Sequence, residues 1–316
     1  MPVTITAGIT FSGGGITTSF APPSGATASW YASSSGSIIT RITYATDTAT
    51  STDRGLLSFT QQEAAAGAGT LTDGWFGGGQ DGGTALITAL VNRITFATDT
   101  ATASVRGPLS TPRKRLTATS DTTTYGWFGG GYGPAPGVRS TIDRITYVTD
   151  TATASVRGPL ERSAYYLAGT GTTTSGWYCG GRDNTIPVNW STVSRITYAT
   201  DTATASVRGP LTAAATGTAA TGDGTTYGWV TIGSSTTTVN RITYATDTAT
   251  ASTRGPLTGT TYNSVGTGNN TYGYFIAVGG PTTVSRITFA TDTNTATNVG
   301  PTSSANFKGG GVSGTQ

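Results

Sequence analysis

Short runs of alternating apolar and polar residues recur along the chain, separated by stretches of glycine, threonine and serine. In the run from Ser140 to Tyr147, isoleucine and tyrosine alternate with polar neighbours, which is the period-two pattern of a half-buried β-strand. Ile145 and Tyr147 are expected to face an adjacent sheet, and Arg144 the opposite side. The pattern predicts that the chain is built largely of short strands.

The residues around this run predict three more strands. A glycine-rich aromatic strand, Tyr125 to Gly131, precedes it, and glycine suits places where backbones approach closely. Residues 149–151, Thr-Asp-Thr, predict a turn, because an aspartate carboxylate can accept the amide two residues on. The chain returns over 152–157 and leaves the strand at Gly-Pro-Leu, since proline cannot donate to a sheet ladder. A variable strand over 164–168 completes four.

The central phrase of this unit occurs six times: Arg-Ile-Thr, an aromatic, a small residue, then Thr-Asp-Thr. Successive copies begin 52, 51, 51, 46 and 45 residues apart. A repeat of this length is too long for one coil of a β-solenoid and suits a four-stranded propeller blade. Sheets packed in a ring cover one another and leave only short edges. The sequence predicts an all-β fold, a six-bladed β-propeller with four antiparallel strands per blade.

The repeats set the expected domain limits. The propeller is predicted over 26–308, with an N-terminal anchor or ring-closing segment over 1–25 and a flexible C-terminal tail over 309–316. Alternatively, one of these terminal segments supplies a strand that closes the ring.

The unit resembles the kelch repeat, over roughly residues 20 to 301. The likeness rests on the Gly-Gly doublet after an aromatic strand, the Arg-Ile-Thr-Tyr strand, the Thr-Asp-Thr turn and the closing Gly-Pro-Leu. The chain departs from the kelch pattern in two ways. Valine (Val105, Val156, Val207) stands where kelch units usually carry a tryptophan, and the glycine doublet is lost after Trp229 and Tyr274.

A narrower resemblance concerns the nearly verbatim phrase Thr-Ala-Thr-Ala-Ser-Val-Arg-Gly-Pro-Leu. It is similar to phrases in uncharacterised kelch-like virion proteins of marine bacteriophages, cyanophages in particular, as is the opening run from Gly8 to Gly15. This resemblance implies a non-enzymatic structural or adhesive virion component, such as a capsid decoration, neck or tail fibre-type appendage. It implies assembly in the host cytoplasm, other virion proteins as partners, and a place in a larger complex. For host-surface attachment, the expected further partner is a host cell-surface glycan.

Arginine and aspartate recur at fixed offsets within each repeat. Arg144, Asp150 and Arg157 lie at offsets 0, 6 and 13, and the sixth copy carries Val299 instead of the last arginine. This spacing predicts a structural ring of Arg–Asp or Arg–carbonyl contacts between blades. The predicted structural positions are Arg41, Asp47, Arg93, Asp99, Arg144, Asp150, Arg195, Asp201, Arg241, Asp247, Arg286 and Asp292.

Loop lengths distinguish the repeats. The gap from the aromatic of the glycine-rich strand to the repeat arginine is 17 or 18 residues in units two to four and 11 or 12 in the others. Loops commonly carry function, so these long loops are the candidate binding surface. An exposed Trp190 can stack on a sugar ring or fold back onto its own blade, and the sequence leaves both open. The alternative function is a lectin-like propeller. The candidate binding residues are Tyr132, Arg139, Arg182, Asp183 and Trp190.

The remaining chemistry argues against an enzyme. The chain has no histidine, the commonest general base and metal ligand, so no catalytic residue, metal or cofactor is predicted. The arginines are dispersed around the predicted ring, which argues against a nucleic-acid partner despite a pI near 9.0. The triplet 113–115, Arg-Lys-Arg, is expected in a solvated loop rather than on phosphate or an anionic glycan. Cys179 is expected to be a buried small residue, and no run is long enough to insert into a membrane.

Overall fold

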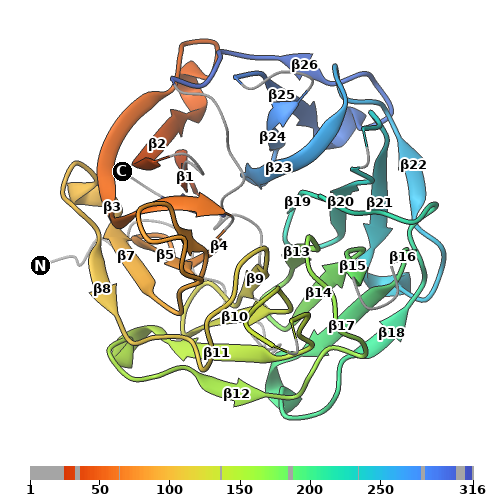
Figure 1. The fold of residues 1–316 in the computed structure, drawn as a ribbon. Helices are drawn as coiled ribbons and strands as arrows, with labels where there is room; N and C mark the ends of the chain where they lie inside the picture. The colour runs from red at the N-terminus through yellow and green to blue at the C-terminus, as the bar shows by residue number, and fades with distance from the viewer. Residues whose placement is uncertain are drawn as a thin grey trace, which may run out of the picture.

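The computed structural model describes residues 25–32, 36–63, 65–135, 137–183, 188–233, 235–278, 282–303 and 310–314. In these residues, six sheets surround a central axis, and in each of them four antiparallel strands lie side by side from the axis to the rim (Figure 1). A short fifth strand extends the sheet of blade 1. The fold is therefore a six-bladed β-propeller, as the sequence predicts. None of the described residues forms a helix long and apolar enough to span a bilayer.

The strands occupy four concentric positions in each blade. From blade 1 to blade 6, the innermost strands are β27 (Gly311–Gly314), β4 (Ala66–Gly69), β9 (Thr117–Ser120), β13 (Ala168–Gly171), β19 (Ala220–Gly222) and β23 (Thr261–Gly268). In the same order, the second strands are β1 (Ala28–Ala32), β5 (Asp73–Gly77), β10 (Tyr125–Gly129), β14 (Ser175–Cys179), β20 (Tyr227–Thr231) and β24 (Tyr272–Val278).

The third strands carry the Arg-Ile-Thr phrase and are β2 (Gly36–Thr43), β7 (Val91–Thr95), β11 (Ile142–Thr146), β17 (Val193–Thr197), β21 (Val239–Thr243) and β25 (Val284–Thr288). The outermost strands are β3 (Thr52–Glu63), β8 (Ser104–Arg106), β12 (Ser155–Arg157), β18 (Ser206–Arg208), β22 (Ser252–Arg254) and β26 (Thr297–Asn298). Three short strands lie in loops: β6 (Gln80–Asp81), β15 (Arg182–Asp183) and β16 (Val188–Asn189).

Several predicted strand limits are wrong. The strand expected over Tyr125–Gly131 ends at Gly129, and the strand expected over 152–157 begins at Ser155. The third strand of blade 3 ends at Thr146, and Tyr147 begins a 3-10 turn, Tyr147–Thr149. The variable strand expected over 164–168 begins only at Ala168, because the residues before it bond to loops instead of a strand. The carbonyl of Ala164 accepts from Gly131 N–H at 2.8 Å.

The ring is closed by the C-terminal segment. Strand β27 pairs antiparallel with β1, with Trp30 opposite Val312, and so becomes the innermost strand of blade 1. The predicted flexible tail is therefore wrong for 311–314, and the alternative of a ring-closing terminal strand holds for this end. The predicted N-terminal anchor falls on 1–25, of which 1–24 lie outside the described residues.

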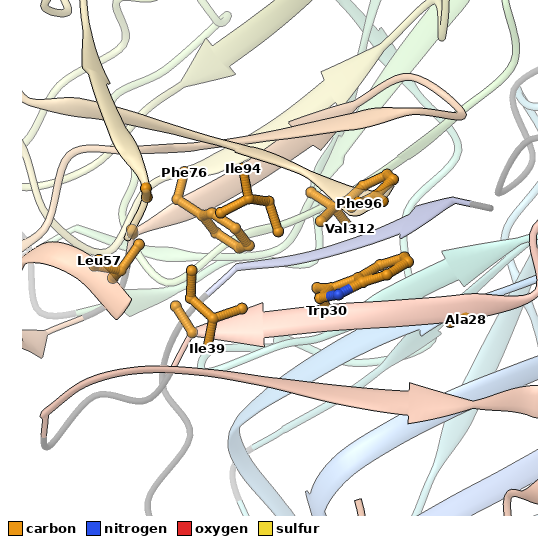
Figure 2. Packing of buried hydrophobic residues seen from close by; sticks show 11 residues of the cluster. Ala28, Trp30, Ile39, Leu57, Phe76, Ile94, Phe96 and Val312 are labelled. Atoms are coloured by element: carbon orange, nitrogen blue, oxygen red, sulfur yellow. The ribbon is translucent and has the colours of Figure 1, made fainter. Parts of the chain in front are cut away.

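The core lies between neighbouring blades. Between blades 1 and 2, Trp30 stacks on Phe96 beside Val312, while Ile39 and Phe76 fill the space farther out (Figure 2). Each repeat tryptophan, or Tyr274 in blade 6, stacks on the aromatic of the Arg-Ile-Thr phrase in the following blade. The ring centroids are 3.8–5.0 Å apart in the pairs Trp30–Phe96, Trp75–Tyr147, Trp127–Tyr198, Trp177–Tyr244, Trp229–Phe289 and Tyr274–Tyr44. The repeat tryptophans are therefore core residues.

The glycine of Gly-Pro-Leu is fixed by the neighbouring blade. A Cβ added to Gly158 would lie 1.9 Å from the carbonyl oxygen of Ala203, which belongs to the turn of blade 4. Equivalent glycines in the other five blades meet a carbonyl at 1.9–2.0 Å, including Gly300 against Ala49 across the closing interface. The phrase therefore ends an outer strand and also allows the blades to come into contact.

The disc has two faces of different character. We call the loop face the side that carries the connections between second and third strands and between successive blades. The turn face carries the six 3-10 turns of the repeat, which begin at Tyr44, Phe96, Tyr147, Tyr198, Tyr244 and Phe289.

Candidate functional site

The repeat aspartates are the centres of inter-blade clusters. Asp201 of blade 4 accepts a hydrogen bond from Trp127 Nε1 of blade 3 at 2.8 Å and from Arg144 Nη1 at 3.0 Å. The Nε atom of Arg157, also in blade 3, lies 3.6 Å from the same carboxylate. The predicted Arg–Asp contacts between blades are therefore present, and the second-strand tryptophan joins them.

The same arrangement runs around the ring. Asp99, Asp150, Asp247 and Asp292 each accept from a tryptophan and from a first repeat arginine of the preceding blade. At the closing interface, Asp47 of blade 1 accepts from Tyr274 Oη at 2.8 Å and from Arg286 Nη1 at 2.7 Å. Val299 stands at the position of the second arginine, so this interface has one cation fewer.

The surroundings of Asp99 favour its ionised form. Burial opposes the charge of Asp99, but hydrogen bonds from Arg54 and Trp30 and the nearby charge of Arg41 outweigh it and lower the pKa of that carboxyl. The repeat aspartate and arginine side chains are thus engaged within the ring, on the side of the disc where its turns lie.

The triplet of basic residues is not simply a solvated loop. Arg113 is fully buried, and its guanidinium donates to Asp143 at 2.7 Å and to the carbonyl of Thr141 at 2.8 Å. Asp143 occupies the place taken by the neutral Asn92 in blade 2 and Asn240 in blade 5. Arg113 therefore neutralises a charge specific to blade 3, and the solvated-loop expectation is wrong for it.

Trp190 folds back onto its own blade. Its side chain is half-buried against the core cluster between blades 3 and 4, and the Arg162 guanidinium carbon lies 4.3 Å from its ring centroid. The indole Nε1 is buried with no hydrogen-bond partner. Of the two conformations left open by the sequence, the structure has the inward one.

The other predicted loop residues are spread over blades 3 and 4. Arg139 donates to the carbonyl of Pro134 at 2.8 Å and so braces its own loop. Arg182 and Asp183 form β15, which pairs with β16 in a small hairpin. The backbone of Arg182 also pairs with that of Tyr165 in an isolated antiparallel β-bridge. Arg139 is therefore engaged in its own loop, and Arg182 is joined through Tyr165 to Tyr132, whose ring lies 5.8 Å from that of Tyr165.

A row of aromatic and basic side chains does come together, and of its members only Tyr132 was among the predicted binding residues. The Tyr132 and Tyr165 rings lie edge to face at 5.8 Å, and Tyr165 and Tyr166 are 5.1 Å apart. The Arg115 guanidinium carbon lies 4.6 Å from the centroid of Tyr166. We call Arg115, Tyr132, Tyr165 and Tyr166 the basic–aromatic row. One feature of the sequence could have indicated this row: Arg115 and Tyr166 each stand immediately before a buried leucine at the start of a blade.

The row leads to a hollow on the axis. A cavity of about 100 Å³ is bordered on the loop face by Arg115, Tyr166, Thr218 and Asn263, and by the first residues of the innermost strands. The axis is narrow because glycine brings these strands together. A Cβ on Gly266, for example, would lie 2.1 Å from the carbonyl oxygen of Ala220.

A second hollow of about 80 Å³ lies on the axis nearer the turn face. It is bordered by hydroxyl groups that already bond between innermost strands. Thr170 Oγ1 donates to the carbonyl of Thr221 at 3.1 Å, and Thr221 Oγ1 donates to that of Thr267 at 3.0 Å. The hydroxyl groups at this end therefore hold the ring together.

Two further predictions concern reactive groups. Cys179 is fully buried, as predicted, and desolvation raises the pKa of its thiol, which disfavours the reactive thiolate. Within the described part of the chain, no three histidine, cysteine, aspartate or glutamate side chains cluster as a metal site would require.

Comparisons with known proteins identify no family for this chain, so its class is taken from its fold. No protein-family model matches the sequence, and no curated protein matches it either. The architecture defines the class, which is that of the six-bladed β-propellers.

Proposed function

We propose that the protein is a non-enzymatic structural and adhesive component of a bacteriophage virion, presenting a rigid propeller disc. The observation that carries this proposal is the ring of inter-blade clusters. Tryptophan, arginine and aspartate recur in nearly every blade, and their side chains are engaged in holding neighbouring blades together. On this proposal, arginine and aspartate side chains of the kind that serve catalysis in other proteins maintain the shape of the disc.

The sequence resemblance supports the viral part of the proposal. The repeat is similar to the kelch repeat, and the phrase around Val156 is similar to phrases in virion proteins of marine bacteriophages. On this proposal the protein joins other virion proteins in the host cytoplasm and remains in the particle, as a capsid decoration, neck or tail fibre-type appendage.

The loop face is proposed as the contact surface. The repeats differ most in their loops, and the longest of these loops belong to blades 2 to 4. Loops held by a rigid scaffold are a common place for binding. The basic–aromatic row lies on this face, between blades 3 and 4.

Purified phage particles test the proposal. Quantitative mass spectrometry of density-purified particles should find the protein at a fixed ratio to the major capsid protein. A non-structural phage protein serves as the control for carry-over. If the protein is depleted from particles in step with that control, the proposed function is wrong.

A further inference from the structure

We propose that the hollow on the loop face binds the acetamido group of an N-acetylated sugar, with Asn263 as the side chain that recognises this group. The inference rests on the proposed adhesive function and names the ligand class of the contact surface. It uses neither Trp190 nor the charges of the loop face.

The first argument is a buried oxygen atom to which the protein supplies no donor. Asn263 is 8% exposed and borders the hollow. Of the buried side-chain polar atoms that border this hollow in the described residues, its Oδ1 atom alone has no hydrogen-bond partner. Because a buried acceptor is costly to leave unpaired, a ligand that donates to this oxygen is bound more tightly.

Neighbouring polar groups are already engaged within the ring. Thr218 Oγ1 donates to the carbonyl of Tyr166 at 3.1 Å, and the carbonyl of Gly217 accepts from the backbone N–H of Asn263 at 3.0 Å. At the second hollow, nearer the turn face, none of the buried side-chain polar atoms of the described residues lacks a partner. The unpaired acceptor therefore distinguishes the loop-face hollow from the other hollow on the axis.

The second argument is the rest of the wall. Small apolar side chains border the hollow, among them Ala66, Ala168 and Ala219, which are each at most 4% exposed, and Val265. The residues that border it include no aspartate or glutamate. A methyl group is favoured against such a wall, whereas an ammonium group would be buried there without a counter-ion. The wall therefore favours an uncharged group that has both a methyl group and a hydrogen-bond donor.

An acetamido group combines these parts. Its N–H donates, its carbonyl oxygen accepts and its methyl group is apolar, so it complements the Asn263 side-chain amide in either orientation of that amide. By comparison with a cavity of about 150 Å³ that holds benzene, the hollow of about 100 Å³ has room for about four non-hydrogen atoms. An acetamido group has that number. The sugar ring to which it is attached therefore stays outside the hollow, on the loop face.

The third argument is the backbone of Asn263. Its φ angle is left-handed, at 57°, and Gly217 has a φ angle of 64° at the equivalent position of blade 5. Glycine adopts this conformation freely, whereas any other residue adopts it at a cost. Blade 5 shows that the ring closes without a side chain at this position. Asparagine thus adds a polar group to the hollow at a strained position, which is typical of functional sites.

A glycan array with the full-length protein tests the inference through matched sugars. N-acetylglucosamine is presented beside glucose and glucosamine, and N-acetylgalactosamine beside galactose. We expect retention of the two N-acetylated sugars and roughly tenfold weaker retention of their counterparts, because the contacts of the amide are lost. Retention should change little as salt is raised, since the recognised group is uncharged. In saturation-transfer NMR with free N-acetylglucosamine, the acetyl methyl protons should receive the largest transfer, because they enter the hollow.

The variant Asn263→Gly removes the recognising side chain. It copies the residue of blade 5, so it should fold with a melting temperature near that of wild type, while binding of N-acetylated sugars falls by roughly tenfold. The matched control is Asn270→Gly, the same change at an exposed residue between β23 and β24 of the same blade. This control should leave both the melting temperature and sugar binding unchanged.

Three results would overturn the inference. They are equal retention of sugars with and without the N-acetyl group, undiminished binding by Asn263→Gly, and a preference for an acetyl-lysine peptide, which would assign the hollow to a protein partner. If the protein is present in phage particles but retains no N-acetylated sugar, the ligand is wrong and the virion role stands. If it retains these sugars but is depleted from particles, the sugar site stands and the virion role is wrong.

Discussion

Replacing Asp201 by alanine tests whether the repeat aspartates stabilise the ring. The change leaves the fully buried Trp127 with an unpaired indole N–H, which costs about 1–3 kcal/mol. It also removes the counter-ion of Arg144 and Arg157, whose side chains are 19% and 20% exposed. Because solvent reaches both guanidinium groups, we reduce the penalty for a broken buried pair to about 1–2 kcal/mol.

The expected loss is therefore about 3 kcal/mol, or roughly 5–8 °C in melting temperature. Urea unfolding followed by tryptophan fluorescence and circular dichroism measures it. Asp201→Asn should lose less, since its amide oxygen still accepts from the indole. Arg144→Met should lower stability and leave any binding activity unchanged. Asp47→Ala, at the interface that lacks the second arginine, should also lose less. If Asp201→Ala unfolds at the wild-type urea midpoint, the clusters do not stabilise the ring.

Further predictions concern other parts of the fold. Gly158→Ala should fold poorly or lose more than about 3 kcal/mol of stability, because its Cβ would lie 1.9 Å from a carbonyl oxygen of blade 4. The control is Gly36→Ala, whose Cβ would meet its nearest neighbour only at 4.0 Å and which should unfold near the wild-type urea midpoint. Arg113→Ala should cost about 3–5 kcal/mol by leaving Asp143 buried without a counter-ion, and adding Asp143→Asn should recover part of it; no recovery would show that Asp143 is not the reason for the arginine. The pKa of Asp99 is lower in the folded protein than in the unfolded chain. Its contribution to the free energy of unfolding is therefore fully present above the unfolded pKa, about 3.9, and is lost as pH falls through the folded pKa. Urea midpoints between pH 6 and pH 2.5 should therefore fall less steeply for Asp99→Asn than for wild type, and parallel curves would contradict this linkage.

The overall fold could be read from the sequence because the repeat is long, regular and present six times. The residues at which strands begin and end were harder to predict from the sequence. The tyrosine of Arg-Ile-Thr-Tyr continues the period-two pattern, so it reads as strand, yet Tyr147 lies in a 3-10 turn. Residues 164–167 precede strand β13, and their loop contacts come from segments that lie far from them in sequence.

The site was predicted only in part for a similar reason. Fixed offsets revealed the Arg–Asp ring, because every copy repeats the same partners. Arg113 and Asp143 occur in one blade only, and a single buried pair 30 residues apart leaves no periodic trace. Arg115 and Tyr166 take equivalent places in consecutive blades, but their left-handed backbone is visible only in three dimensions.

The pairing of β27 with β1 joins the last described strand to the first and has a consequence for biosynthesis. On the ribosome, blades 2 to 6 can each assemble from contiguous sequence as they emerge. Blade 1 has to wait with an open inner edge until Val312 leaves the exit tunnel. During that interval Trp30 and its neighbours lack part of their cover, so a chain that has not yet reached Val312 would expose this inner edge to aggregation.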